Sequence, residues 1–270
     1  MTMMKEDILK SLNEQQIEAV KATEGKVRVV AGAGSGKTRV LTSRYAYLVE
    51  RLGIDPANIL CMTFTNKAAQ EMKTRIRKMV DLGAVNDYVC TIHGLCVKIL
   101  RKEIYRMGYP QNFIIIDDDD RKTLMKQVME ELNLTKKDFT VAQLLDNVDM
   151  EKGRQLYLDL MMPGVDIPQD NPNATFYRFL QLQKQSFLLD FNDLIFFTLY
   201  LFKTIPEVKA YWQNEFDYIQ VDEVQDCSKS DWEIIDTLSE KNGNLFIVGD
   251  PDQSIYEWRG AKPDLFVGFK

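Results

Sequence analysis

One short glycine-rich segment constrains the fold of this 270-residue chain more than any other feature. It reads AGAGSGKT at residues 31–38 and directly follows the apolar, β-branched run 27–30. It fits the P-loop pattern G-x-x-x-x-G-K-[ST], with Ala31 in place of the first glycine. Its glycines would let the backbone turn N–H groups onto phosphate oxygens, and the following helix would add its positive N-terminal end. An ordinary glycine-rich turn between a strand and a helix is the alternative, and the GSGKT string disfavours it.

The residues of this segment have separate expected roles. Lys37 would supply positive charge to the β- and γ-phosphates of a nucleotide, and the hydroxyl of Thr38 would bind Mg²⁺. The expected nucleotide-binding residues of the segment are Gly32, Ala33, Gly34, Ser35, Gly36, Lys37 and Thr38.

Five apolar runs rich in β-branched residues predict the strands of a parallel sheet. Each run is continuous rather than alternating, which is typical of strands buried on both faces. Helical patterns separate the runs, so the chain predicts an α/β fold. The runs are 27–30, 59–64, 89–92, 218–221 and 245–248.

The interval between the third and fourth runs is far too long for one crossover. Residues 96–189 are mostly helical in pattern and broken by prolines, which predicts an inserted helical subdomain. The core domain would then comprise residues 1–95 and 190–270. Within the insertion, the acidic run 117–120 could ligate a metal. Capping of a helix that begins near Arg121 is favoured, because negative charge stabilises a helix start.

Composition excludes several classes of protein. The chain is 45% apolar, which is enough for a core, and no apolar run reaches the length of a membrane span. Its first residues contain no apolar signal segment. It has one histidine and four cysteines, which form no C-x-x-C pair, so a zinc site or a disulfide scaffold is not expected. We therefore expect a cytoplasmic protein without membrane partners.

The net charge of −6 is unevenly distributed. Residues 1–110 carry 18 Lys and Arg against 11 Asp and Glu, whereas the remaining residues carry 16 against 29. An acidic total argues against unspecific coating of nucleic acid, but the basic part can still bind phosphates locally.

A pair of carboxylates follows the fourth run. Asp222 would belong to the Mg²⁺ shell, and Glu223 would orient or deprotonate an attacking water. Without the P-loop, two acidic residues after an apolar run would usually indicate only that the end of a strand is exposed to solvent. Ligands of open parallel sheets bind at the carboxyl ends of strands, where both this pair and the P-loop are expected. Phosphoryl transfer to a small molecule, switching and motor work are all compatible with such a site.

Four further strings narrow the choice. They are LNEQQIEAV at 12–20, MTFTNKAA at 62–69, TIHG at 91–94 and GDPDQSIYEWRGA at 249–261. Together with AGAGSGKTR and VDEVQD, and in the same order, they resemble the UvrD/Rep/PcrA family of superfamily 1 DNA helicases. The resemblance implies a RecA-like P-loop NTPase fold and the cofactors ATP and Mg²⁺. It also implies 3′-to-5′ translocation in DNA repair or replication, with single-stranded DNA and single/double-strand junctions as partners.

The resemblance also implies roles for single residues. Gln16 is similar to the family's adenine-reading glutamine, and Arg39 would flank the nucleotide. Lys37, Glu223 and Gln253 would be catalytic, with Gln253 linking the γ-phosphate to the DNA site. The residues expected to line the single-strand groove are Phe64, Thr65, Asn66, His93, Tyr256, Trp258 and Arg259.

General physics supports the DNA assignment for the last three of these residues. Stacking on aromatic side chains contributes roughly 1–3 kcal/mol per base, and a guanidinium can bind the backbone. A buried aromatic pair beneath a loop is the alternative. The basic helix face with Lys67, Lys73, Arg75, Arg77 and Lys78 would meet phosphates or simply be solvated.

Departures from the family pattern include Val224 and Ile92, where the family usually has aromatic residues. Family helicases are also much longer, and their second RecA-like domain supplies arginines to the γ-phosphate. We therefore expect this chain alone to be a monomer that binds nucleotide and DNA weakly and barely hydrolyses ATP. The rival hypotheses are a P-loop kinase of a small metabolite, a non-catalytic single-strand-binding module and a nuclease-fused helicase of the same superfamily.

Overall fold

The computed structural model describes residues 8–80, 87–135, 139–153, 156–168, 173–254 and 260–269. By internal contacts the chain forms two compact units. The first, called the sheet unit here, comprises residues 1–95 and 206–270, and the second, the helical unit, comprises residues 96–205. The chain thus returns to the sheet unit at residue 206 rather than at the expected 190.

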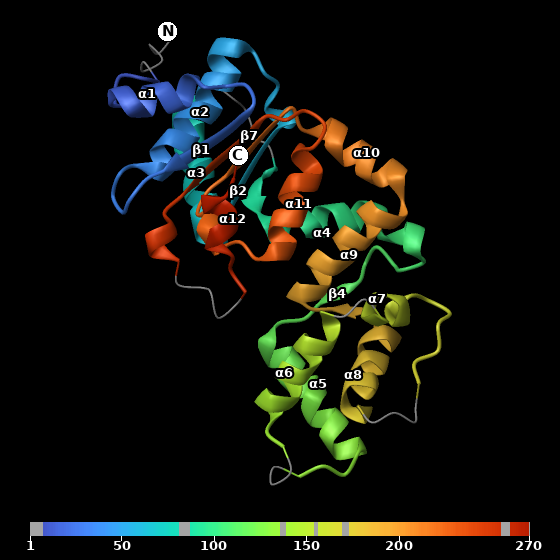
Figure 1. Cartoon of the computed structure of the whole chain (residues 1–270). Coiled ribbons are helices and arrows are strands. Elements are labelled where there is room, and N and C mark those ends of the chain that lie inside the picture. Colours follow the sequence, from blue (N-terminus) through green and yellow to red (C-terminus); the bar gives the residue numbers. More distant parts are fainter. Residues whose placement is uncertain are drawn as a thin grey trace. The chain divides into compact units, whose positions relative to one another are not determined.

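The sheet unit is built on a parallel sheet with the strand order β1-β7-β6-β2-β3 (Figure 1). All five strands coincide with the apolar runs of the sequence, so the expected RecA-like α/β fold is confirmed. The strands are β1 (Lys26–Val30), β2 (Ile59–Thr63), β3 (Val89–Thr91), β6 (Tyr218–Val221) and β7 (Leu245–Gly249).

Helices cover both faces of this sheet because the chain winds in two directions. From β1 through β2 to β3 the connections advance one way, and right-handed crossovers place α2 (Lys37–Leu52) and α3 (Asn66–Met79) on one face. The step from β6 to β7 runs the other way, so α11 (Lys229–Ser239) covers the opposite face, where α10 (Pro206–Glu215) packs against it. Figure 1 shows this division.

A core of the sheet unit lies between one face of the sheet and the helices that cover it. Tyr45 of α2, Ile76 of α3 and Phe246 of β7 are fully buried in one cluster, to which α1 (Glu14–Lys21) contributes Val20. Short elements complete the unit: η1 (Pro56–Asn58), η3 (Val224–Asp226), η4 (Pro251–Gln253) and α12 (Pro263–Val267).

The helical unit contains six helices, one 3-10 turn and two short paired strands among the described residues. Helix α4 begins in the sheet unit and continues into the helical unit. The helices are α4 (Ile92–Glu103), α5 (Asp118–Glu131), α6 (Val141–Lys152), α7 (Leu156–Met161), α8 (Ala174–Gln185) and α9 (Phe191–Thr204), with η2 (Ile104–Met107) between α4 and α5. The strands are β4 (Ile114–Ile115) and β5 (Leu188–Leu189).

Asp117 caps the start of α5. The acidic run 117–120 therefore caps a helix, as the favoured interpretation of the sequence predicted. The Asp117 side chain accepts from the N–H groups of Asp119 and Asp120, each at 2.9 Å, and Asp120 completes a capping box. The helix therefore starts at Asp118, slightly before the expected position near Arg121. Among the residues that the structure describes, no three or more His, Cys, Asp or Glu are grouped to hold a metal.

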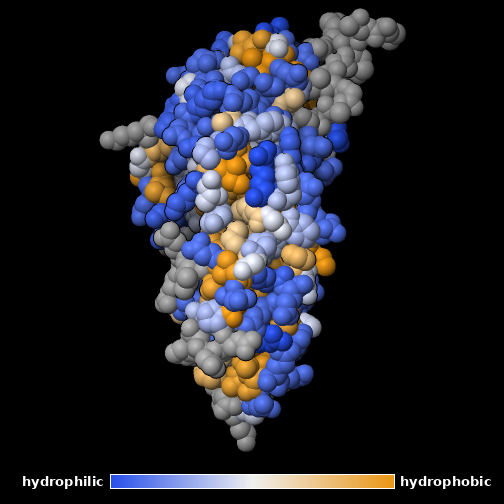
Figure 2. Space-filling model, turned by 90° about the vertical axis from the view of Figure 1, so that its right-hand side faces the viewer, coloured by the Kyte–Doolittle hydropathy of each residue, from blue (hydrophilic) through white to orange (hydrophobic). Residues whose placement is uncertain are grey.

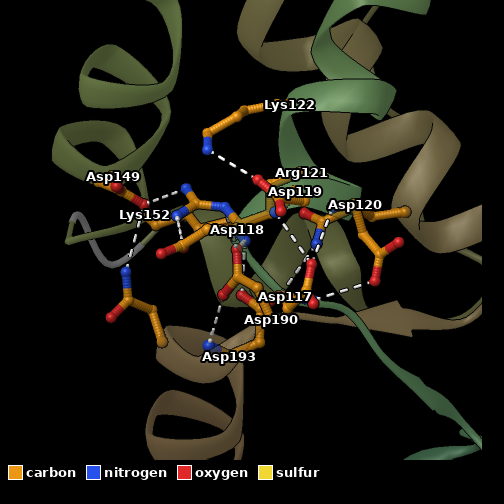
Figure 3. A network of polar contacts seen from close by, with 12 residues as sticks. Asp117, Asp118, Asp119, Asp120, Arg121, Lys122, Asp149, Lys152, Asp190 and Asp193 are labelled. Carbon is orange, nitrogen blue, oxygen red and sulfur yellow. Dashed lines mark hydrogen bonds and ion pairs between the residues drawn. The ribbon is translucent and has the colours of Figure 1, made fainter. Parts of the chain in front are cut away.

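A buried network of charges connects three helices of this unit (Figure 3). Lys152 of α6 is fully buried and donates to Asp190 at 2.7 Å and to Asp193 at 2.8 Å. Arg121 of α5 pairs with Asp190 at 3.2 Å. These contacts tie the start of α9 into the helical unit, which accounts for the position of the unit's boundary at residue 205.

The protonation of this network follows from burial and pairing. Burial and the neighbouring charge of Asp190 raise the pKa of Asp193 to about 6. Burial acts to lower the pKa of Lys152, but its two carboxylate partners outweigh this effect and raise it. The lysine thus stays charged, and its two hydrogen bonds offset the loss of hydration.

Exposed hydrophobic side chains are scattered rather than concentrated. Val30, Ile114 and Met150, from three different elements, are among the most exposed of them. On the face seen in Figure 2, hydrophobic residues form separate patches within a mostly hydrophilic surface. In the described part of the chain, every helix is too short or too polar to cross a bilayer.

We predict that Lys152→Met destabilises the chain strongly, because it leaves Asp190 and Asp193 buried without their shared cation. Removal of one partner from a buried pair typically costs about 3–5 kcal/mol. Urea denaturation followed by circular dichroism measures the change. Lys122→Met is the matched control, since Lys122 contacts only the exposed Asp119 in this network. Equal stability of the two variants would contradict this account.

Candidate functional site

The glycine-rich loop leads from β1 directly into α2. Gly34 and Gly36 have φ values of 70° and 89°, in the left-handed region that favours glycine. Gly36 caps α2 without any side-chain hydrogen bond. The N–H groups of the first turn are therefore not satisfied by a capping side chain, as an anion site requires.

Two pairs of polar side chains meet between α2 and the end of β6. The Lys37 Nζ atom lies 3.1 Å from Glu223 Oε2, and the Lys37 side chain is 8% exposed. The Thr38 hydroxyl donates to Asp222 Oδ2 at 3.4 Å. The structure thus brings together four residues to which the sequence assigned phosphate, metal and water chemistry.

The two neighbouring carboxylates differ in their surroundings. Burial, followed by the negative charge of Glu223, raises the pKa of Asp222 to about 6, against the opposing effects of Lys37 and Thr38. Glu223 is partly exposed and has φ 51° and ψ 41°. That left-handed conformation is strained for a residue with a side chain, and such strain is frequent at functional sites.

Gln225 and Asp250 also belong to this site, although the sequence motifs predicted no role for either residue. The buried Gln225 amide donates to Glu223 Oε2 at 2.9 Å and accepts from the Asp250 N–H at 3.0 Å. Gln253 in turn donates to the Asp250 carboxylate. One signal was available: Asp250 follows a strand run just as Asp222 does, so both carboxylates had to reach the same sheet edge.

Gln16 lies against the glycine-rich loop. Its amide donates to the Ser35 carbonyl at 2.8 Å, while its oxygen accepts from the Asn13 N–H at 3.0 Å within a capping box. A groove of about 550 Å³ runs beside it, lined by residues of α1, β1 and the loop. Arg39 donates to the Ser11 carbonyl at 3.4 Å.

The structure describes four of the seven residues that are expected to line the single-strand groove. Phe64 and His93 are half-buried and line one small hollow together with Asp222. Burial lowers the pKa of His93, and the charge of Asp231 opposes this shift. Thr65 and Asn66 are exposed at the start of α3, where Thr65 accepts from the Ala68 N–H at 3.1 Å. Tyr256, Trp258 and Arg259 lie outside the described residues.

The family model of the UvrD/REP helicase N-terminal domain matches residues 12–270. The chain belongs to this family. The helicase resemblance inferred from the sequence is thereby confirmed.

Among the relatives of this UvrD/REP domain are two proteins named ATP-dependent DNA helicase PcrA. One, from Staphylococcus aureus strain Mu50, is 43% identical over 265 residues, which is 97% of this chain and 36% of the relative. The other, from Staphylococcus epidermidis, is 41% identical over 264 residues, with the same shares covered. The chain thus spans about a third of the length of these curated relatives.

The buried Asp222 carboxylate should lower the stability of this UvrD/REP domain. Because the folded chain disfavours ionised Asp222, its charge destabilises above about pH 6, and this effect fades as the pH falls towards 4. We predict that Asp222→Asn raises the free energy of unfolding by about 2–3 kcal/mol at pH 8.

Urea denaturation of the nucleotide-free chain at pH 8 and near pH 4 measures this gain, which should nearly vanish at the lower pH. Asp252→Asn is the control, since Asp252 is exposed on the neighbouring η4 turn. A stability loss at pH 8 would show that the Asp222 charge is favourable in the fold.

Proposed function

We propose that this chain is the ATP-binding motor domain of a DNA helicase that translocates 3′-to-5′ along single-stranded DNA. One observation carries the proposal. Lys37 and Thr38, at one strand–helix junction, meet Glu223 and Asp222 at the end of another strand. Membership of the UvrD/REP family supports reading this arrangement as a helicase site rather than a small-molecule kinase site.

The residues fit Mg²⁺–ATP. The Lys37 Nζ atom is buried and has no well-aligned hydrogen bond among the described residues, although it pairs with Glu223. An added phosphate oxygen would satisfy it. The Thr38 hydroxyl and the Asp222 carboxylate offer the hard oxygen ligands that Mg²⁺ takes, with phosphates and water completing its shell. Bound Mg²⁺–ATP would supply a cleavable phosphoanhydride and a cation that neutralises its charge.

Each residue of the chain then has a defined task. Lys37 binds the β- and γ-phosphates, and Glu223 accepts a proton from the attacking water. Gln253 would contact the γ-phosphate and link it to the DNA site; in the nucleotide-free chain its amide donates to the Asp250 carboxylate. Gln16 would turn its amide from Ser35 to adenine, and Arg39 would flank the nucleotide.

Single-stranded DNA would bind at the carboxyl ends of β2 and β3. Phe64 and His93 lie there, in the hollow that also includes Asp222 at the end of β6. This shared hollow supports a direct coupling between DNA contact and metal binding. Lys67, Arg77 and Lys78 are exposed on α3 and would bind backbone phosphates, whereas Arg75 pairs with Glu71 at 2.5 Å.

The complete protein would add a second RecA-like domain, whose arginines reach the γ-phosphate, and would act as a monomer in the cytoplasm at single/double-strand junctions. Without those arginines the isolated chain would hydrolyse ATP slowly. The family resemblance supports this part of the proposal.

The test is steady-state ATP hydrolysis by the complete protein with and without oligo-dT. Lys37→Ala should lower the DNA-stimulated rate by at least about 100-fold, since it removes a preorganised cation from the phosphates. Lys241→Ala is the matched control, because the exposed Lys241 precedes β7 and therefore lies at the amino end of the sheet. Hydrolysis indifferent to DNA, or DNA binding indifferent to both ATP and Lys37→Ala, would refute the motor function.

A second prediction concerns the DNA contact itself. Phe64→Ala should weaken oligo-dT binding by roughly 1–3 kcal/mol, because it removes a stacking surface. Fluorescence anisotropy measures the affinity, with Phe139→Ala as the control, since Phe139 is an exposed aromatic of the helical unit. Equal affinities in both variants would remove Phe64 from the DNA site.

A further inference from the structure

Gln225 occupies an unusual position between the ends of two neighbouring strands. It is 2% exposed and lies in η3, just beyond β6, beside the end of β7. Its side-chain amide donates to Glu223 Oε2 at 2.9 Å and accepts from the Asp250 N–H at 3.0 Å. One buried amide therefore connects the carboxylate after β6 with the main chain after β7.

The orientation of this amide is fixed by chemistry. A backbone N–H can only donate, so the oxygen of Gln225 must face Asp250. The NH₂ group consequently faces Glu223, whose carboxylate can only accept when ionised. A residue that cannot donate at this position would leave the Glu223 oxygen without that hydrogen bond.

Gly249 provides the space for the amide. A Cβ atom added at this residue would lie 2.5 Å from Gln225 Oε1 and 3.1 Å from Val224 Cγ1. The close approach, rather than backbone conformation, requires glycine here, because Gly249 is not among the positive-φ residues. The end of β7 is thus shaped around the Gln225 side chain.

Glu223 Oε2 has two partners, the Lys37 ammonium in an ion pair at 3.1 Å and the Gln225 amide in a hydrogen bond at 2.9 Å. A bound triphosphate would draw the Lys37 ammonium towards its oxygens. Glu223 would then keep Gln225 as a donor at the same oxygen. Glu223 is strained and partly exposed, and it must hold one geometry to act on water. Once Lys37 has moved, the hydrogen bond from the Gln225 amide is the contact that keeps this geometry.

We propose that Gln225 is a positioning residue that holds the Glu223 carboxylate in its working geometry after Lys37 moves to the nucleotide. This inference rests on the proposed ATP-hydrolysing function. It also gives Asp250 a role, because the Asp250 N–H fixes the amide and the Asp250 carboxylate accepts from Gln253. Glu223 is thereby connected to Gln253 through two intermediate residues.

The experiment compares three variants of the complete protein: Gln225→Leu, Gln225→Glu and Ser254→Ala. Gln225→Glu is nearly isosteric and can still accept from Asp250, but its ionised form cannot donate to Glu223. Ser254→Ala is the matched control, since the Ser254 hydroxyl donates to the Gln225 main-chain carbonyl at 3.4 Å and not to its side chain. The measurements are kcat and KM for DNA-stimulated ATP hydrolysis, and affinity for a fluorescent ADP by titration.

Both Gln225 variants should lower kcat by about 100-fold, the loss expected when a reacting group is misplaced. Their KM for ATP and their ADP affinity should stay within about threefold of wild type, because Lys37 and the loop remain. Ser254→Ala should change none of these values.

Wild-type kcat in Gln225→Leu would overturn the inference, because leucine offers Glu223 no donor. So would parallel losses of kcat and ADP affinity in both Gln225 variants, since these would indicate a general structural role. Failure of the proposed function is distinguishable, because the wild-type protein would then show no DNA-stimulated hydrolysis at all.

Discussion

The ion pair between Lys37 and Glu223 is the contact on which this site depends. It joins the start of α2 to the end of β6, two segments that only a parallel sheet brings to the same edge. The chain that leaves β1 enters α2 on one face of the sheet, whereas the chain that leaves β6 leads to α11 on the opposite face. The glycine-rich loop, the two carboxylates and Gln225 all lie at this edge of the sheet.

The two units use buried charges in contrasting ways. In the helical unit, the buried Lys152 ammonium donates to two carboxylates of the same unit. In the sheet unit, Lys37 is nearly as buried, but it has one carboxylate partner and no well-aligned hydrogen bond among the described residues. The first arrangement is closed and stabilises a junction of helices. The second is incompletely satisfied, as expected where a ligand is to be bound.

Local patterns predicted much of the fold and part of the site. The five strands, the glycine-rich loop and the Asp117 cap each depend on residues close together in the sequence, so their chemistry could be read directly. Gln225 could not be assigned in this way. Its partners come from the ends of two strands, and its buried seat depends on the absence of a side chain at Gly249.

The domain boundary shows the same limitation. The Asp190 segment was expected to begin the return to the sheet. Instead, its carboxylates pair with Lys152 and Arg121, far away in the sequence, and these contacts keep α9 in the helical unit. The sequence pattern placed residue 190 in the core domain, whereas non-local charge pairing joins α9 to the helical unit.

The most direct measurement of the central claim is the nucleotide affinity of Glu223→Gln in the wild-type and Lys37→Ala backgrounds. If Glu223 holds Lys37 in the nucleotide-free chain, its neutralisation frees the ammonium for phosphate. Binding of fluorescent ADP should then become about tenfold tighter, a change of roughly 1.4 kcal/mol. The gain should disappear when Lys37 is absent. Unchanged or weaker binding in Glu223→Gln, or an equal gain without Lys37, would contradict the role assigned to this ion pair.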